Sequence, residues 1–133
     1  MKFPEKIRVF GDVDYRGNCP KEDAEQAAFF CWLRATHPEL GQIAFHTRNE
    51  GALTRGQVRR HKVEGMTSGV ADIVIPGRPA LAIELKRRDH TKSGISKDQI
   101  DWLTRAQRAG WVVCLALGAD AAAEAVEEWL KKP

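Results

Sequence analysis

The sequence predicts an α/β protein in which helices flank a central mixed β-sheet. Apolar residues recur at the three- and four-residue spacing of amphipathic helices in several segments. Two short apolar runs joined by a Pro-Gly turn, within residues 70–86, are typical of a hairpin. The unbroken apolar run 111–117 is typical of a strand buried on both faces. Together these segments predict the order helix, strand, helix, strand, strand, helix, strand, helix (α-β-α-β-β-α-β-α).

The length and composition predict one globular domain that covers residues 1–133. Hydrophobic residues make up 43% of the chain and charged residues 29%, which leaves enough apolar material for a hydrophobic core. The net charge of +3 is compatible with a nucleic-acid partner but does not by itself indicate one.

Three widely spaced cysteines form neither a metal-binding pattern nor a disulfide framework. Two of them, Cys31 and Cys114, lie in apolar runs, so we expect both to be buried. The first residues lack the apolar segment of a signal peptide, and no run approaches the length of a membrane span. We therefore expect an intracellular, cytoplasmic protein without a membrane partner.

The first third of the chain is expected to hold a short strand at 7–10 and an amphipathic helix. The helix should begin at Pro20 and end before Pro38, because a residue that precedes proline avoids helical geometry. Glu25 is placed at the edge of its apolar stripe. That stripe is expected to consist of Ala24, Ala27, Ala28, Cys31, Trp32 and Ala35.

The segments before the hairpin are predicted to be a strand at 43–46, a turn at 49–51, a basic helix at 53–64 and a loop at 65–69. A polar, basic loop follows the hairpin. The next helix starts at Ser96, which has capping-box spacing to Gln99, and stops at Gly110. A final helix is predicted at 119–131. Its inward residues are expected to be Ala122, Val126, Trp129 and Leu130.

Three charged residues, Asp72, Glu84 and Lys86, interrupt the apolar hairpin, although an unpaired buried charge is very costly. Alternate residues of a strand share a face, so a register that pairs Val74 with Ala82 also places Asp72 opposite Glu84. Opposed residues have Cβ atoms about 4.5–5.5 Å apart. Two carboxylates that close repel each other unless a cation lies between them or one is protonated.

The cation that this arrangement favours is a hard one. Two carboxylates with waters and a backbone carbonyl suit Mg²⁺ or Mn²⁺. Lys86 lies two residues beyond Glu84 on the same face, where its ammonium can orient or deprotonate a water and stabilise charge on a phosphate. The pattern therefore indicates metal-assisted chemistry on an anionic substrate.

Asp72 followed by Glu84-Leu85-Lys86 resembles the PD-(D/E)xK nuclease motif. The wider sequence, from about residue 21 to 117, resembles the VRR-NUC branch of that superfamily. Ala71 stands where the motif has a proline; because that proline shapes the backbone and ligates nothing, we expect activity to survive the difference. The segments that carry the wider resemblance are Asn49-Glu50-Gly51, residues 65–75, Ile83-Glu84-Leu85-Lys86, Gln99-Ile100-Asp101-Trp102-Leu103 and Gly110-Trp111.

The resemblance implies a restriction-endonuclease-like core and metal-dependent hydrolysis of phosphodiester bonds in DNA. In that family pattern Asp72 and Glu84 ligate Mg²⁺ or Mn²⁺ together with the Leu85 carbonyl, and Lys86 is the catalytic lysine. Stand-alone members resemble phage-borne enzymes that form homodimers and cut branched DNA such as Holliday junctions. The expected setting is a bacterium or a phage-infected host.

Two helix residues join the proposed site through the resemblance. Gln99 matches a glutamine that points into the site, but a capping-box glutamine needs no other role, and one side chain is not expected to do both. Glu25 matches a first-helix acid that binds metal directly or through water, although such a residue alone is more often a surface acid. Asp72 alone could equally cap a turn; its placement with Glu84 and Lys86 on one face makes that alternative the weaker one.

Basic residues near the proposed site are expected to contact DNA phosphates without reading sequence; a solvated helix face is the alternative for those in the basic helix. Two other functions stay open: a nuclease with simple duplex or flap preference, and a non-catalytic DNA-binding module of the same fold. The intact set of two carboxylates and a lysine argues against the second. The basic residues are Arg55, Arg59, Arg60, Lys62, Arg87, Arg88, Lys92 and Lys97.

Overall fold

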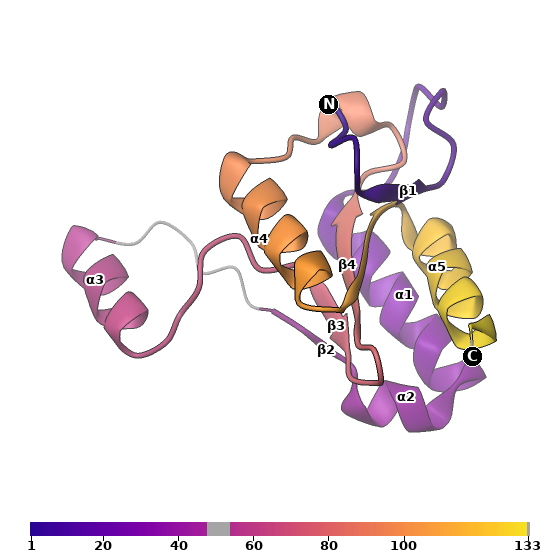
Figure 1. The fold of residues 1–133 in the computed structure, drawn as a ribbon. Helices are drawn as coiled ribbons and strands as arrows, with labels where there is room; N and C mark the ends of the chain where they lie inside the picture. Colours follow the sequence, from indigo (N-terminus) through magenta and orange to yellow (C-terminus); the bar gives the residue numbers. More distant parts are fainter. Residues whose placement is uncertain (48–53, 133) are drawn as a thin grey trace.

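A five-stranded mixed sheet lies at the centre of the computed structural model, which describes residues 1–47 and 54–132 (Figure 1). The turn expected at 49–51 lies outside the described residues. In spatial order the strands are β1 (Arg8–Phe10), β5 (Val112–Leu117), β4 (Leu81–Lys86), β3 (Ile73–Ile75) and β2 (Phe45–His46). Strand β5 pairs in parallel with β1 and β4, whereas β3 is antiparallel to β4 and to β2. The mixed α/β class is confirmed.

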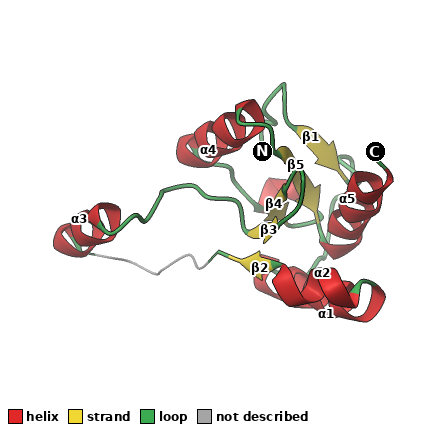
Figure 2. Ribbon diagram, turned by 60° about the horizontal axis from the view of Figure 1, so that its bottom comes forward, coloured by secondary structure: helices red, strands yellow, loops and turns green. Residues whose placement is uncertain are grey.

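Helices cover both faces of this sheet (Figure 2). Helices α1 (Glu22–Thr36) and α5 (Ala119–Lys131) pack on one face, over a core that includes Phe29, Ile83 and Val126. Helix α4 (Lys97–Arg108) packs on the other, where Leu103 meets Ala82 and Leu115. The remaining helical segments are α2 (Pro38–Ile43), α3 (Arg55–Val63) and the short 3-10 helix η1 (His90–Lys92).

The hairpin of β3 and β4 has the predicted register. Val74 pairs with Ala82, and Ile73 pairs with Ile83. The isoleucines pack towards α1 and α5, so the alternate residues of β4, including Glu84 and Lys86, face the side of α4. All six residues of β4 are buried. The chain thus carries two charged side chains into the interior on one face of its central hairpin.

The predicted inward stripe of α1 is wrong. The residues that α1 buries are Glu25, Phe29, Phe30 and Leu33, while the four alanines and Cys31 are exposed. Burial of a Phe or Leu removes far more apolar surface from water than burial of an alanine, so the large side chains decide which face turns inward. The helix also starts two residues later than expected, with Lys21 as its N-cap.

A second difference is the helix α2, which the sequence interpretation missed. Pro38 ends α1 as expected, but it also occupies the first turn of α2, where its missing N–H and fixed φ are tolerated. Ile43 therefore belongs to α2, and the strand expected at 43–46 shrinks to β2. Helix α5 has the predicted bounds, with Ala122 and Val126 buried, but Leu130 is exposed.

Helix α3 stands apart from the layered body in two views (Figures 1 and 2). Thr54 and Gln57 form a capping box at its start. None of its residues is buried, and only His61 is half-buried. No helix within residues 1–47 or 54–132 has the length and hydropathy needed to cross a membrane.

Candidate active site

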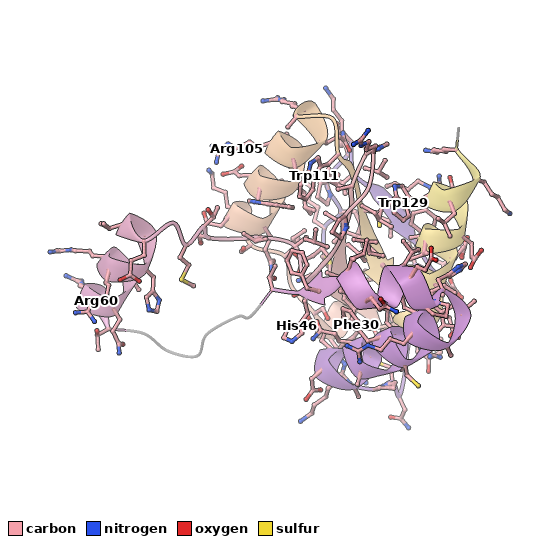
Figure 3. The ribbon with its side chains drawn as sticks, turned by 90° about the horizontal axis from the view of Figure 1, so that it is seen from below. Phe30, His46, Arg60, Arg105, Trp111 and Trp129 are labelled. Carbon is pink, nitrogen blue, oxygen red and sulfur yellow. The ribbon has the colours of Figure 1, made fainter. Side chains whose placement is uncertain are left out.

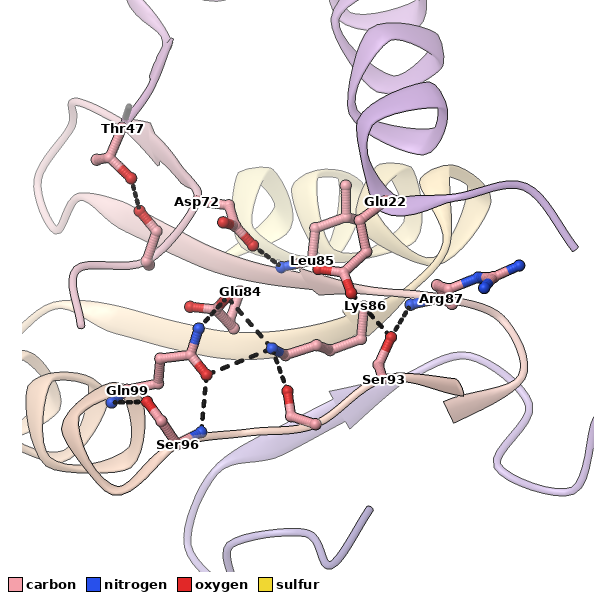
Figure 4. Close-up of polar contacts among 12 residues, drawn as sticks. Glu22, Thr47, Asp72, Glu84, Leu85, Lys86, Arg87, Ser93, Ser96 and Gln99 are labelled. Atoms are coloured by element: carbon pink, nitrogen blue, oxygen red, sulfur yellow. Dashed lines mark hydrogen bonds and ion pairs between the residues drawn. The ribbon is translucent and has the colours of Figure 1, made fainter. Parts of the chain in front are cut away.

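Asp72 and Glu84 lie together where β3 and β4 run side by side (Figure 4). Asp72 directly precedes β3, and continuing the Ile73–Ile83 register by one residue puts it opposite Glu84. The Leu85 backbone N–H donates to Asp72 Oδ2 at 2.8 Å, which fixes the aspartate carboxylate against β4. The hairpin therefore brings the two carboxylates together, as its alternation predicts.

Glu84 is 1% exposed, and its Oε2 atom has no hydrogen-bond partner among the residues that the structure describes. Burial, together with the negative charge of Asp72, raises the pKa of Glu84 to about 10, and the nearby Lys86 only partly opposes this. Two carboxylates this close are stable only when one of them is protonated or a cation lies between them. At neutral pH the metal-free pair therefore holds a proton that a cation can replace.

The donor set fits a hard dication that keeps part of its water shell. Within the described parts of the chain, no three His, Cys, Asp or Glu side chains lie close enough to hold a metal by themselves. Two carboxylates with an unpaired oxygen, supplemented by a backbone carbonyl and waters, are what Mg²⁺ or Mn²⁺ accepts.

Lys86 is buried beside this pair, and three oxygen atoms surround its ammonium (Figure 4). Its Nζ donates to the Gly94 carbonyl at 2.5 Å and to Gln99 Oε1 at 3.4 Å, and lies 3.7 Å from Glu84 Oε1. These contacts hold the ammonium on the carboxylate face of β4 rather than in solvent. The lysine is therefore already oriented towards a group bound at the pair.

Gln99 performs both of the roles that we expected to exclude each other. Its Oε1 accepts from the Ser96 backbone N–H at 2.9 Å, completing the capping box of α4, while its Nε2 donates to Glu84 Oε1 at 3.3 Å. The expectation was wrong because an amide carries an acceptor and a donor on separate atoms. The start of α4 and the carboxylate pair thus share one side chain.

Ser96→Ala and Gln99→Ala separate these two roles. Each variant breaks the capping box, so each should lower the free energy of unfolding by about 1 kcal/mol, measured by urea denaturation. Only Gln99→Ala also removes the contacts to Glu84 and Lys86, so it alone should lower the rate of the Mg²⁺-dependent DNA cleavage that the resemblance implies, by about 10–100-fold. An equal loss of rate in both variants would show that the cap accounts for the whole effect.

Glu25 does not join the pair, contrary to its expected place. Its carboxylate accepts from Arg88 Nε at 3.1 Å and from the Ala119 backbone N–H at 3.3 Å, so it binds the start of α5. Glu25 in turn raises the pKa of Arg88 by hydrogen bonding and charge. These partners give this buried acid a structural role.

Glu22, one turn earlier on α1, lies beside Ser93 and Lys86 in Figure 4, and the sequence interpretation missed it. Its Oε2 accepts from Ser93 Oγ at 2.9 Å, and its negative charge contributes to the raised pKa of Glu84. The three-residue spacing from Glu25 puts both acids on one side of α1. That spacing was the available signal, but it does not say which of the two faces the site.

The basic residues after the hairpin hold other parts of the chain. Arg87 donates to the carbonyls of Cys19 and Pro20, and Lys92 donates to the Gly17 carbonyl. Arg88 binds Glu25, and Lys97 pairs with Asp101 at 2.8 Å. DNA phosphates would have to compete with these intramolecular partners. The phosphate contacts expected of these residues stay predictions.

A cleft of about 390 Å³ opens beside the start of α4, and Asp72 and Gln99 are among the residues that line it. The loop at 66–70 forms one wall together with Ser96 and Asp98. Ser68 Oγ donates to Asp98 Oδ2 at 2.7 Å, which fixes that loop to the first turn of α4. The cleft therefore gives access to the Asp72 carboxylate and to Gln99, which binds Glu84.

Comparison with known proteins identifies the fold. No protein-family model matches the amino-acid sequence, and no curated protein sequence does. Among solved structures, a protein titled "VRR_NUC domain protein" matches with a TM-score of 0.70, at 19% identity, over 88% of this chain and 92% of that chain. The chain has the VRR_NUC fold. The resemblance found in the motifs is thus confirmed at the level of the fold, and the restriction-endonuclease-like core is confirmed with it.

Proposed function

We propose that this protein is a metal-dependent, structure-selective DNA endonuclease that hydrolyses phosphodiester bonds in branched DNA such as Holliday junctions. The observation that carries the proposal is the buried Asp72–Glu84 pair, whose unpaired Glu84 oxygen adjoins the oriented ammonium of Lys86. A nuclease fold and a cleft that reaches Asp72 support it.

Asp72, Glu84 and the Leu85 carbonyl are the proposed ligands of one Mg²⁺ or Mn²⁺ ion. Such an ion, when bound, polarises a phosphoryl oxygen and makes a water more acidic. Lys86 is placed to stabilise the added negative charge of the phosphate or to hold the attacking water. Gln99 keeps Glu84 and Lys86 in position, and Glu22 replaces Glu25 as the proposed first-helix acid near the ion.

Branched DNA and a homodimer are proposed from the resemblance to stand-alone VRR-NUC proteins. A four-way junction needs two symmetric cuts, and each chain offers one carboxylate pair, so a two-fold dimer supplies the second. A simple duplex or flap nuclease is the alternative within the same chemistry. A non-catalytic DNA-binding module is disfavoured because Asp72, Glu84 and Lys86 are all present.

Incubation of the purified protein with junction, flap and linear duplex DNA tests the proposal. We expect Mg²⁺- and Mn²⁺-dependent cleavage that EDTA abolishes, with the junction cut fastest. Equal cleavage of all three substrates would favour the simpler nuclease, and binding without cleavage would favour the module. Gel filtration at the assay concentration tests the dimer, and a purely monomeric profile would contradict it.

A further inference from the structure

Helix α3 lacks the packing that a helix of its length needs. It has nine residues, buries none of them, and stands away from the sheet and the other labelled helices (Figure 1). Figure 3 shows Arg60, on α3, far from the labelled residues of the body. Isolated helices shorter than about 12–15 residues are marginal in water, even with a good cap. The structure therefore presents a capped helix that still requires a partner.

Its charges gather on one side. At 100° per residue, Arg55, Arg59 and Lys62 fall within about 60° of one another, whereas Arg60 lies about 140° from Arg55. Within residues 1–47 and 54–132, none of these four cations has a hydrogen-bond or ion-pair partner. This distinguishes them from the basic residues after the hairpin, which have such partners. The three-cation face extends about 10 Å along the helix, about three base-pair steps of one DNA strand.

The loop that follows α3 is fixed to the first turn of α4 at the cleft. Ser68 binds Asp98, and a Cβ at Gly69, whose φ is +78°, would lie 2.3 Å from the Asp98 carbonyl oxygen. That close approach admits only glycine. From Val63 to Ser68 the chain spans at most about 17 Å, so α3 remains near the cleft mouth.

We propose that α3 is a DNA-binding arm whose helix is stabilised by the sugar-phosphate backbone, with Arg55, Arg59 and Lys62 on phosphates outside the scissile one and Arg60 facing away. The inference rests on the proposed function only in taking DNA as the substrate. A polyanion fits the face by charge. The same face of a second copy fits it poorly, because three cations would meet three cations.

DNA binding in EDTA tests the arm without cleavage. Each lost phosphate contact lowers the slope of log affinity against log salt by about 0.9. The triple variant Arg55→Ala/Arg59→Ala/Lys62→Ala should therefore lose about 2.7 from the slope, which is about 40-fold in affinity change between 50 and 200 mM salt. Arg59→Ala and Arg60→Ala form a matched pair, and only Arg59→Ala should lower the slope. Equal effects of the two would overturn the assignment of the face.

Hydrogen exchange of the α3 amides shows what stabilises the helix. We expect rapid exchange in the free protein and protection on adding duplex DNA. Protection already present without DNA would overturn the proposal. Protection that grows with protein concentration alone would overturn it in favour of a second copy.

Hydrolysis of bis(p-nitrophenyl) phosphate with Mn²⁺ separates the arm from the catalytic site. This small ester fits the cleft without reaching α3, so the triple variant should hydrolyse it at the wild-type rate while losing activity on DNA. If the wild type binds no DNA, the proposed function fails. If the wild type binds and cuts DNA and the triple variant does so equally well, only the arm fails.

Discussion

Lys86→Ala is expected to lower the rate of metal-dependent DNA cleavage by on the order of 10²–10⁴-fold, the range found when a positioned acid, base or charge-stabilising group is removed. Its ammonium lies 3.7 Å from Glu84 Oε1 and is held there by the Gly94 carbonyl, so the variant removes the cation that forms an ion pair with Glu84. Single-turnover cleavage with saturating protein measures the chemical step apart from binding. Fluorescence anisotropy of labelled DNA in EDTA should show that Lys86→Ala binds DNA with nearly the wild-type affinity.

Lys97→Ala is the matched control for this variant. Lys97 is a lysine near the same end of α4, but its ammonium is exposed and pairs with Asp101. Its removal should change the single-turnover rate at saturating protein by less than a few-fold, because a lost phosphate contact weakens binding rather than the chemical step, and an exposed ion pair contributes little. Cleavage by Lys86→Ala at the wild-type rate would remove Lys86 from the mechanism.

Glu84→Gln is expected to abolish cleavage while leaving the metal-free protein at least as stable as the wild type. The buried carboxyl already binds a proton in the absence of metal, and a neutral amide of the same shape replaces that protonated acid without a buried charge. A ligand at 100 times its Kd raises the free energy of unfolding by about 2.7 kcal/mol. In thermal unfolding, Mn²⁺ should therefore raise the Tm of the wild type and leave the Tm of Glu84→Gln unchanged.

The pH dependence of stability provides a second measurement on the same pair of proteins. The pKa of Glu84 rises from 4.5 to about 10 on folding, so its protonated form stabilises the metal-free fold below pH 4.5. That contribution is lost as pH rises towards 10, because the folded state must then release a proton that the unfolded state has already lost. The wild type should lose stability relative to Glu84→Gln between pH 5 and 9.

Glu25→Gln is the matched control, since it alters another buried glutamate. It should lower stability by about 1–3 kcal/mol, because Arg88 and the Ala119 N–H lose a charged acceptor, but it should keep the Mn²⁺-dependent rise in Tm. If Glu25→Gln abolished that rise and Glu84→Gln did not, the assignment of the two acids would be reversed.

The hairpin was predictable from sequence because its alternation leaves one consistent register. Shifting β3 by one residue would turn Ile73 and Ile75 away from the core, so the apolar pattern itself fixes Asp72 opposite Glu84. The bounds of α4 were predictable from Ser96 and Gly110, because a capping box and a left-handed glycine are local signals.

The inward face of α1 and the acid nearest the site were not predictable in this way. Alanine is compatible with either face of a helix, so the spacing of four alanines, Cys31 and Trp32 predicted the wrong buried face. In the structure Phe29 and Leu33 define the face of α1 that is buried. Whether Glu22 or Glu25 faces the pair depends on Arg88 and Ala119, which lie far along the chain. Such contacts become visible only once the sheet has brought those segments together.

Because the Gln99 side chain both caps α4 and binds Glu84 and Lys86, fraying of the first turn of α4 also disrupts the carboxylate site. When the first turn of α4 unwinds, the Ser96 cap is lost, and Glu84 and Lys86 lose their common partner in the same event. Helix ends open at lower free energies than whole domains. Unwinding of this turn therefore disrupts the site, and under the proposed function a DNA strand bound in the cleft beside Ser96 raises the fraction of molecules with an assembled site, because it binds the closed form.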